Sequence, residues 1–317
     1  MEQTTPPSEP RAPGSPGPRP PRRMRRVRHG WAVAAAVALC AVGVGAGVGA
    51  VAHAHSTAAV QPAVPTAATA SGGAGKSAAA PAKSAIDAEL DAGINAVIDA
   101  NTEYQIGVAV VDVSDGADPT AVHEYGVQAP FVAASTAKVL AAEAYYHLVE
   151  TGEASLDDPL GAYTAEFQLQ AMIQQSDNDS WSLIMDAVGH EELAEYAASI
   201  GVDYAATSNT LTPAEMARIL GGLYSGDLLE PADTAQLLSF MQDTNNETLI
   251  PAAVPDGITV FHKYGLLNGA LHDAGILAKD GKAYAVVIYT KGAGPDSIPA
   301  RTEVIHDLTA AAADALF

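Results

Sequence analysis

The residues of this chain whose types and spacing could support catalysis include a serine and a lysine three positions apart. Ser135 and Lys138 form the only S-x-x-K pair in the sequence. Two short polar motifs follow, Ser176-Asp177-Asn178 and then His262-Lys263-Tyr264-Gly265. A serine hydroxyl is a weak nucleophile at neutral pH, so an enzyme that acylates it must place a base within hydrogen-bond reach. The spacing makes Lys138 the candidate for that base.

The same pair predicts a helix that begins near Ser135 and runs to about Glu150. Residues i and i+3 lie one turn apart on the same face of a helix, which would place the Lys138 amine beside the Ser135 hydroxyl. The serine would occupy the helix N-terminus, where free N–H groups and the positive dipole end favour a developing oxyanion. The pattern therefore predicts acyl transfer through Ser135.

The three motifs, in this order, resemble those of the serine β-lactamase and penicillin-binding superfamily, which carries S-x-x-K, S-D-N and K-T-G. Within it, the chain resembles the class A β-lactamase-like branch over roughly residues 85–317. The surroundings are similar too: Phe131 and Ala134 ahead of the serine, Met172-Ile173 ahead of the S-D-N motif, and the segment LTPAEMARILGGLYSG at 211–226.

The resemblance implies an α+β fold, an antiparallel β-sheet flanked by helices plus a helical subdomain, with the site at their seam. The hydrophobic patterns are compatible with that order. Helices are expected over residues 84–100 and 301–317, with helical segments between 169 and 241. Breaks between those segments are expected at Gly189, Gly201, Pro213 and Gly226. Strands are expected at 105–113, 258–263, 274–278 and 283–290, with a hairpin turn at Asp280-Gly281.

The resemblance also implies a role for each residue of the first two motifs. Ser135 would attack the substrate carbonyl, Lys138 would take its proton, and Ser176 would relay a proton toward the leaving nitrogen. Asn178 would hydrogen-bond the substrate amide and help to position Lys138, while Asp177 would brace the turn. The alternative is that Ser176-Asp177-Asn178 only caps the helix that follows it.

The third motif would complete the site. Lys263 would supply positive potential beside Ser176. The backbone N–H groups of Ser135 and Leu266 would form the oxyanion hole, where such donors act on developing charge. Gly265 fits a close approach of the backbone to a ligand.

Tyr264 departs from the family pattern, which places a small hydroxyl there to hold the substrate carboxylate. A phenol cannot occupy the same volume, and the only arginines after residue 30 are Arg218 and Arg301. An unpaired carboxylate costs several kcal/mol on desolvation, so we expect weak binding of anionic β-lactams. His272 could replace the missing partner if protonated, but His262 and His272 could each be a polar strand residue instead.

A second departure is the glutamate that class A β-lactamases use to activate the deacylating water. Between Gly201 and Thr212 the chain has only VDYAATSNTL, in which Asp203 is the sole carboxylate. The nearby glutamates fall in a helical pattern at Glu191, Glu192 and Glu195. General-base assistance is commonly worth roughly 10²- to 10⁴-fold. We therefore expect acylation without efficient deacylation.

The segments ahead of the hydrolase domain predict export. Residues 1–30 are a basic segment, and residues 31–54 are an apolar stretch that fits either a cleaved signal peptide or a signal anchor. Residues 55–84 form a linker rich in Ala, Pro, Ser and Thr, and residues 85–317 form the domain. In both cases the domain is expected outside the cytoplasm, secreted or anchored to the plasma membrane, with membrane contact only through residues 31–54.

The amino-acid composition limits the classes of molecule that the domain can bind. Residues 1–30 hold seven of the sixteen basic residues and two of the thirty-seven acidic ones, which leaves nine basic against thirty-five acidic. A domain this acidic has no basic surface for phosphates, so nucleic acid is excluded. No metal or cofactor is expected, because the only cysteine is Cys40 and no H-x-x-x-H pair occurs. We expect a monomer that acts on a small-molecule or cell-wall peptide substrate.

Three functions remain open from the sequence. The first is a class A-like serine hydrolase that acts on a β-lactam or a related amide or ester. The second is a penicillin-binding, DD-peptidase-like enzyme of the cell envelope, which would not rely on the missing glutamate. The third is a noncatalytic module that captures a ligand. Tyr264 and the short loop favour the third function, whereas the intact Lys138 and S-D-N motif argue against it.

Overall fold

The computed structural model describes residues 85–118 and 120–317 of the chain. The predicted basic segment 1–30, signal segment 31–54 and linker 55–84 lie outside these described residues. In the described part of the chain, no helix has both the length and the apolar character that crossing a membrane requires.

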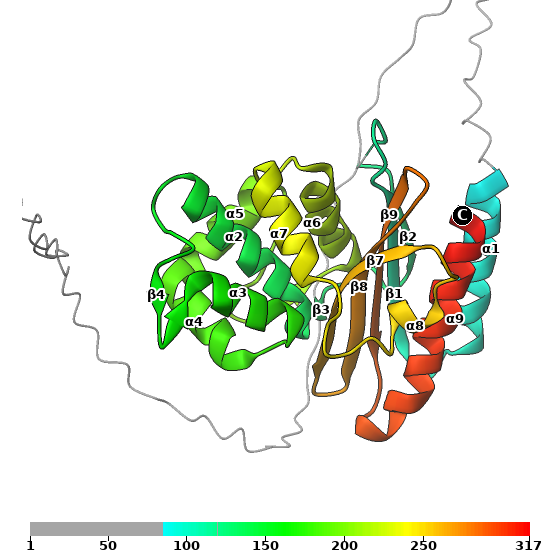
Figure 1. The fold of residues 1–317 in the computed structure, drawn as a ribbon. Coiled ribbons are helices and arrows are strands. Elements are labelled where there is room, and N and C mark those ends of the chain that lie inside the picture. Colours follow the sequence, from blue (N-terminus) through cyan, green and yellow to red (C-terminus); the bar gives the residue numbers. More distant parts are fainter. Residues whose placement is uncertain (1–84, 119) are drawn as a thin grey trace, which may run out of the picture. The chain divides into compact units, whose positions relative to one another are not determined.

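An antiparallel five-stranded sheet forms the centre of the described fold, with the strand order β2-β1-β9-β8-β7 (Figure 1). Its strands are β1 (Gln105–Asp112), β2 (Val122–Gly126), β7 (Thr259–Leu267), β8 (Ala270–Lys279) and β9 (Lys282–Lys291). The first strand pairs with the last, with Gln105 opposite Lys291 and Asp112 opposite Tyr284. This confirms the predicted antiparallel sheet.

The last three strands are longer than their patterns predicted. β7 continues past Lys263 to Leu267, and β8 already begins at Ala270. The predicted turn at Asp280-Gly281 joins β8 to β9 through two left-handed residues, with φ of 52° and 80°. A second turn of this kind at Asn268-Gly269 (φ 47° and 88°) joins β7 to β8. It was missed, although Asn-Gly between apolar segments is a strong hairpin signal.

One face of the sheet is covered by helices from both ends of the domain. They are α1 (Ala85–Ala100) and α9 (Ile298–Leu316), with the short α8 (Ile250–Ala253) beside α9 (Figure 1). Side chains of β1 alternate between the two faces, as strand geometry requires. Val108 and Val110 pack with these helices, whereas Ala109 and Val111 pack on the opposite side. The sheet is therefore buried on both faces.

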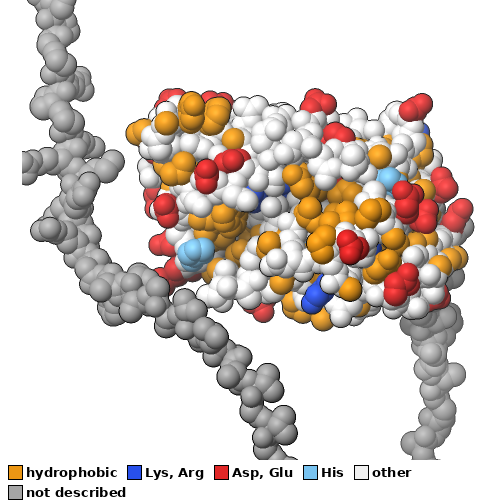
Figure 2. All heavy atoms as spheres, turned by 90° about the horizontal axis from the view of Figure 1, so that it is seen from below, with side chains coloured by type: hydrophobic (Ala, Val, Ile, Leu, Met, Phe, Trp, Pro, Cys, Tyr) orange, Lys and Arg blue, Asp and Glu red, His pale blue; other side chains and the backbone are white. Residues whose placement is uncertain are grey.

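The surface of the described domain is predominantly acidic. On the face shown in Figure 2, acidic side chains are spread along the edges and basic side chains are sparse. Hydrophobic side chains gather in several patches on that face. The large hydrophobic residues with strongly exposed side chains are Val132, Tyr163, Phe167, Leu266 and Leu267.

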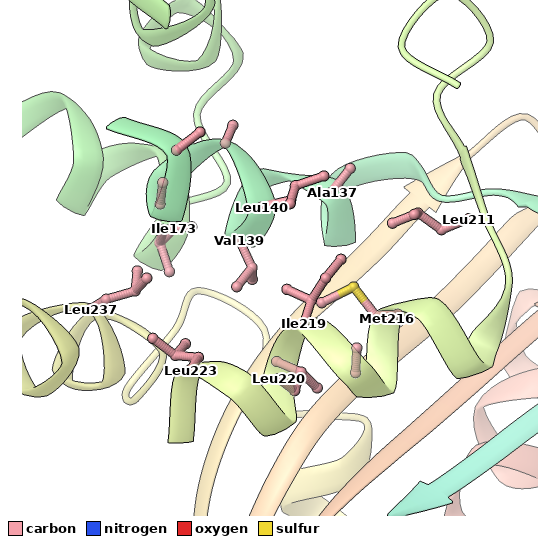
Figure 3. Packing of buried hydrophobic residues seen from close by; sticks show 14 of the residues in the cluster. Ala137, Val139, Leu140, Ile173, Leu211, Met216, Ile219, Leu220, Leu223 and Leu237 are labelled. Atoms are coloured by element: carbon pink, nitrogen blue, oxygen red, sulfur yellow. The ribbon is translucent and has the colours of Figure 1, made fainter. Parts of the chain in front are cut away.

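The other face of the sheet carries the helical subdomain (Figure 1). Its helices are α2 (Lys138–Glu150), α3 (Ala165–Gln174), α4 (Asn178–Val188), α5 (His190–Ser199), α6 (Pro213–Ser225) and α7 (Pro231–Phe240). α6 packs on the sheet, and the start of α2 packs on α6. Figure 3 shows Ile219 and Met216 on the side of α6 that faces Ala137, Val139 and Leu140 in this core. The apolar core thus fixes α2 and the turn ahead of it.

Glycine and proline interrupt the helical subdomain where predicted. Gly189 separates α4 from α5, and Gly201 follows α5. α6 begins at Pro213 behind a capping box and ends at Gly226, which is left-handed with φ of 75°. The short elements that complete the described fold are β3 (Phe131–Val132) with β6 (Thr210–Leu211), β4 (Pro159–Leu160) with β5 (Tyr163–Thr164), and a 3₁₀ turn at Pro295–Ser297.

Candidate active site

Ser135 lies on a single 3₁₀ turn, Ala134–Ala137, directly ahead of α2. The helix itself begins at Lys138, three residues later than predicted. Ala134 has φ of 53°, a left-handed conformation that is uncommon for a residue other than glycine. Strained residues of this kind cluster at functional sites. Ser135 is half-buried while the rest of the turn is buried, so it is the residue of the turn that remains open.

Lys138 is only 3% exposed, and its side chain binds the S-D-N loop. Its Nζ donates to the Ser176 carbonyl at 2.7 Å, to the Asp177 carbonyl at 3.1 Å and to Asn178 Oδ1 at 2.8 Å. The Ser176 hydroxyl lies 3.5 Å from the same nitrogen. Two motifs that are far apart in the sequence therefore meet at one amine.

Burial lowers the pKa of Lys138 to about 8, while the charge of Asp177 acts in the opposite direction. A lysine with this pKa gives up its proton far more readily near neutral pH than an exposed lysine does. That property is the one a general base needs.

The S-D-N loop is shaped by a left-handed residue and a helix cap. Ser176 has φ of 53°. Asp177 is the N-cap of α4, and its carboxylate accepts a hydrogen bond from Ser180 N at 2.6 Å, which holds the pKa of Asp177 below its usual range. The Asp177 carbonyl binds Lys138 as well. Helix capping and lysine binding thus occur in the same three residues.

Lys263 is fully buried on β7. Its Nζ donates to the Tyr264 carbonyl at 3.1 Å and lies 4.1 Å from the centre of the Tyr264 ring. Burial and, secondly, the charge of Lys138 lower the pKa of Lys263 to about 7. The two amines are thus close enough to influence each other's charge.

Gly265 brings β7 against the turn that carries Ser135. A methyl group at Gly265 would lie 3.1 Å from the Ala133 carbonyl oxygen and 3.2 Å from both Ala134 Cβ and the Ser135 backbone nitrogen. The sequence suggested a close backbone approach to a ligand at this glycine. The approach in the structure is to the Ser135 turn, and Leu266 follows on the same strand.

A cavity of about 110 Å³ opens at Ser135. The predicted site residues that line it are Ser135, Lys138, Asn178 and Leu266. The lining residues that were not predicted as part of the site are Ala134, Trp181, Asn209 and Leu267. None of these described lining residues carries a carboxylate. The predicted residues that lie outside the lining are Ser176, Asp177, Lys263, Tyr264 and Gly265.

Asn209 enters the cavity from the short loop ahead of β6. It has φ of 50°, its Nδ2 donates to the Ala134 carbonyl at 3.1 Å, and its Oδ1 accepts from the Tyr204 hydroxyl at 3.2 Å. This side chain therefore links the loop to the strained residue next to Ser135. An asparagine within Ser-Asn-Thr, a residue type that tolerates left-handed φ, was the available signal in the sequence.

Tyr264 points to a loop and does not line the cavity. Its hydroxyl donates to Asn245 Oδ1 at 2.9 Å. Asn245 in turn donates from Nδ2 to the Gln175 carbonyl at 2.7 Å and from its backbone to the Gln174 carbonyl at 2.9 Å. Tyr264 is therefore linked through Asn245 to the residues just ahead of Ser176.

His262 of β7 and His272 of β8 are both buried but differ in charge. His262 Nδ1 lies 2.9 Å from Asp273 Oδ1, and its Nε2 lies 3.2 Å from Glu247 Oε1 and 3.1 Å from Thr244 Oγ1. Although burial opposes it, the charge of Asp273, together with hydrogen bonds to Asp273 and Glu247, raises the pKa of His262 to about 9. His262 is therefore a buried cation that holds the loop carrying Thr244.

His272 is a neutral side chain. Its Nε2 donates to the Val132 carbonyl at 2.9 Å, and its Nδ1 accepts from Thr290 N at 3.0 Å. Burial lowers the pKa of His272 to about 4. The suggestion that a protonated His272 replaces the missing carboxylate partner is therefore wrong. Arg301 does not replace it either, because it is buried on α9 and donates to the Thr290 carbonyl and hydroxyl.

Comparison with known proteins places the chain in a family. A family model described as "Beta-lactamase enzyme family" matches residues 89–316. No curated protein sequence matches the chain.

Solved structures share the fold of the domain. A mutant of PBP-A, described as an acyl-enzyme complex with penicillin G, is 24% identical with a TM-score of 0.64, over 72% of this chain and 96% of that one. A β-lactamase from Sphaerobacter thermophilus is 23% identical with a TM-score of 0.61, over 71% of this chain and 95% of that one. A β-lactamase from Xanthomonas campestris is 22% identical with a TM-score of 0.65, over 73% and 99%. The chain belongs to the β-lactamase enzyme family, and its domain has the class A β-lactamase fold.

Proposed function

We propose that this protein is an exported serine hydrolase that forms an acyl-enzyme on Ser135 with a β-lactam or a related amide or ester. The observation that carries the proposal is the placement of Lys138. Its buried Nζ lies among the oxygens of the S-D-N loop, and the same lysine lines the cavity onto which Ser135 opens. Membership of the family supports the same chemistry.

In the proposed acylation, the neutral amine of Lys138 takes the hydroxyl proton of Ser135 as the serine oxygen bonds to the carbonyl carbon. The oxyanion is held by the backbone N–H groups of Ser135 and Leu266. The carbon–nitrogen bond of an amide, or the carbon–oxygen bond of an ester, then breaks. The proton passes from Lys138 through the Ser176 hydroxyl, which is 3.5 Å away, to the leaving group. Asn178 holds Lys138 and, in this proposal, the substrate amide.

Lys263 supports this chemistry by its charge. A second buried amine near Lys138 disfavours two positive charges, so it promotes the neutral form of one of them. A protonated Lys263 also supplies positive potential for the negative charge that develops on the substrate.

We infer that deacylation is weak. Hydrolysis of the acyl-enzyme requires a water and a base, and the described lining of the cavity offers no carboxylate. The short loop instead contributes Asn209, whose amide nitrogen is used by the Ala134 carbonyl. Without general-base assistance, this step loses roughly 10²- to 10⁴-fold in rate. The acyl-enzyme is then expected to accumulate.

The second candidate function is that of a penicillin-binding, DD-peptidase-like enzyme of the cell envelope. The observation that favours it is again the lining without a carboxylate. One structural neighbour, PBP-A, is described in a mutant form as an acyl-enzyme with penicillin G. The third possibility, a noncatalytic module that captures a ligand, has less support, because Lys138 already contacts the S-D-N loop.

Intact-protein mass spectrometry tests the proposal directly. The full chain is exposed briefly and for long periods to penicillin G, with a chromogenic cephalosporin assay alongside. We expect a lasting adduct that is lost in Ser135→Ala and kept in Ser239→Ala, an exposed serine on α7. Rapid colour with a transient adduct would refute weak deacylation. If penicillin G and activated esters both leave Ser135 unmodified, the acyl-enzyme proposal fails.

The export part of the proposal rests on residues 1–54. Fractionation of cells that express the full chain, with protease added to intact spheroplasts, should show the domain accessible from outside. Protection from the protease until the cells are lysed would contradict it.

A further inference from the structure

A groove of about 420 Å³ lies beside the S-D-N loop, separate from the cavity at Ser135. Part of its lining is a row of residues at intervals of four that begins ahead of α3 and ends just after it: Tyr163, Phe167, Ala171 and Gln175. Residues at this spacing lie on one side of a helix. α4 contributes Leu183 to the same groove. This groove takes no part in the acyl transfer proposed above.

The aromatic part of the groove is open to solvent. Tyr163 is 58% exposed and Phe167 is 45% exposed, and their rings stack with centres 4.3 Å apart. The stacked pair therefore offers a ready surface for an apolar group of a ligand.

The charged residues that line the groove are both acidic. Asp177 and Asp179 contribute to the lining, which contains no Lys, Arg or His. Asp177 is ionised at neutral pH, because the hydrogen bond from Ser180 N lowers its pKa. Asp179 is exposed in the first turn of α4. Carboxylates and aromatic faces both attract cations, so the groove is matched to a positively charged group and not to an anion.

The groove and the cavity share one turn of helix. Asn178 lines the cavity at Ser135, while the residues on either side of it, Asp177 and Asp179, line the groove. The cavity holds only about 110 Å³, well below the roughly 300–1,000 Å³ of typical small-molecule sites. A substrate larger than this cavity extends beyond it, and the groove is lined by the two residues that flank Asn178 in the sequence.

We propose that the groove is a specificity subsite for a part of the substrate that has an apolar stem and ends in a primary amine. The stem lies along Tyr163 and Phe167, and the ammonium group is held by Asp177 and Asp179. The inference rests on the proposed hydrolase function for the reaction at Ser135. Binding in the groove, however, does not need that reaction, so the two ideas can be tested apart.

The binding test uses the full chain carrying Ser135→Ala. Ligand-observed NMR titration measures the affinity for hexylammonium, with 1-hexanol as its neutral match. We expect hexylammonium to bind several-fold more tightly than hexanol. Asp179→Asn and Phe167→Ser should each weaken hexylammonium by about twofold to fivefold, the range for one exposed charge or cation–aromatic contact. Asp186 is an exposed aspartate on the same helix, and Asp186→Asn should leave the affinity for hexylammonium unchanged.

The kinetic test uses wild-type chain and two esters that differ only in the terminal amine, p-nitrophenyl hexanoate and p-nitrophenyl 6-aminohexanoate. We expect faster acylation by the amino ester. Asp179→Asn should remove most of that preference and leave the neutral ester unchanged, while Asp186→Asn leaves both rates as they are.

Each outcome decides between the two ideas. Equal binding of hexylammonium and hexanol, no binding of either, or binding that ignores Asp179 and Phe167 would each overturn the amine subsite. Binding that depends on Asp179, while neither ester nor penicillin G acylates Ser135, would keep the amine site and reject the hydrolase proposal. Acylation by both esters at equal rates would keep the hydrolase and reject the subsite.

Discussion

Lys138 is subject to two opposing influences on its charge. The three oxygen acceptors around Nζ favour an ammonium ion, whereas burial favours the neutral amine. Burial dominates, and the pKa falls to about 8. The proposed base is therefore partly neutral under physiological conditions, without being free of the loop that orients it.

The first prediction concerns this titration. The acylation rate should rise about tenfold per pH unit below pH 7, because only the neutral Lys138 amine accepts the Ser135 proton, and it should fall above about pH 8, where Lys263 has lost its positive charge. The measurement is the rate of adduct formation by mass spectrometry between pH 6 and 9. Lys138→Arg should abolish acylation, since arginine stays protonated, whereas Lys279→Arg at the end of β8 should not. A flat profile would show that Lys138 is not the base.

The second prediction concerns Gly265. A methyl group there would crowd the Ala133 carbonyl and the Ser135 nitrogen at 3.1–3.2 Å, so the Ser135 turn must move. Gly265→Ala should slow acylation by roughly tenfold to hundredfold, because small displacements at a reacting group are costly. Gly294→Ala is the matched control, since nothing lies within 4 Å of its Cβ position. Equal acylation rates in the two variants would show that acylation does not need the close contact between β7 and the Ser135 turn.

At the scale of residues, the spacing of the S-x-x-K motif predicted Lys138 close to Ser135, and the family resemblance added Asn178. The structure brings Lys138 and Asn178 into contact, and all three residues line one cavity. Asn209 and Trp181 were missed, since their place at the cavity depends on how distant segments pack.

At the scale of elements, a loop after α7 ties the sheet to the helical subdomain. Its Thr244 and Glu247 bind the charged His262 of β7, and its Asn245 binds both Tyr264 and the end of α3. The buried histidine, with Asp273 on its other side, holds this connection in place. The S-D-N loop follows directly after the part of α3 that is held.

The third prediction is a pH dependence of stability that comes from His262. Its pKa is raised to about 9 in the folded protein from 6.5. The stabilisation is therefore complete below about pH 6.5 and is lost as the pH rises through 9. The loss amounts to about 3 kcal/mol. Denaturant unfolding of the wild type and of His262→Gln between pH 6 and 9.5 measures it as the difference between the two proteins, because the lowered pKa values of Lys138 and Lys263 add an opposite slope to both. The stability advantage of the wild type over His262→Gln should shrink as the pH rises through 9, whereas the exposed His190→Gln should follow the wild type; a difference between wild type and His262→Gln that does not change with pH would contradict the assignment.

The order of the elements could be predicted because each has a clear periodicity, but some boundaries could not. β7 and β8 extend beyond their apolar segments, since hydrogen bonding to a neighbouring strand continues through polar residues such as His272 and Asp273. The seam between sheet and helices came only from the family resemblance. Hydrophobic pattern alone cannot show which side of a strand faces which helix.

At the scale of the whole molecule, charge should govern encounters with substrates. The chain has a net charge of −21, and basic side chains are sparse on the face in Figure 2. Such a field repels anions over distances that salt shortens to about 10 Å at 0.1 M ionic strength.

The fourth prediction follows from this field. Raising sodium chloride from low to physiological concentration should speed acylation by penicillin G, which is an anion, and slow acylation by p-nitrophenyl 6-aminohexanoate, which is a cation. The uncharged hexanoate ester should not respond. Second-order acylation rates over a salt series provide the measurement. A parallel response of all three compounds would point to an effect of salt on the protein and not on the encounter.

The pairing of β1 with β9 also has a consequence for folding. β1 is among the first elements of the domain, yet both of its neighbours are needed to bury it, and β9 begins about 170 residues after β1 ends. Contacts between such distant segments form slowly, because a large loop must close before they bring any gain. The central sheet cannot be completed until nearly all of the chain is available. The proposed export would therefore act on a chain whose central sheet is still incomplete, and an incompletely folded chain is the form that threads through a translocation channel.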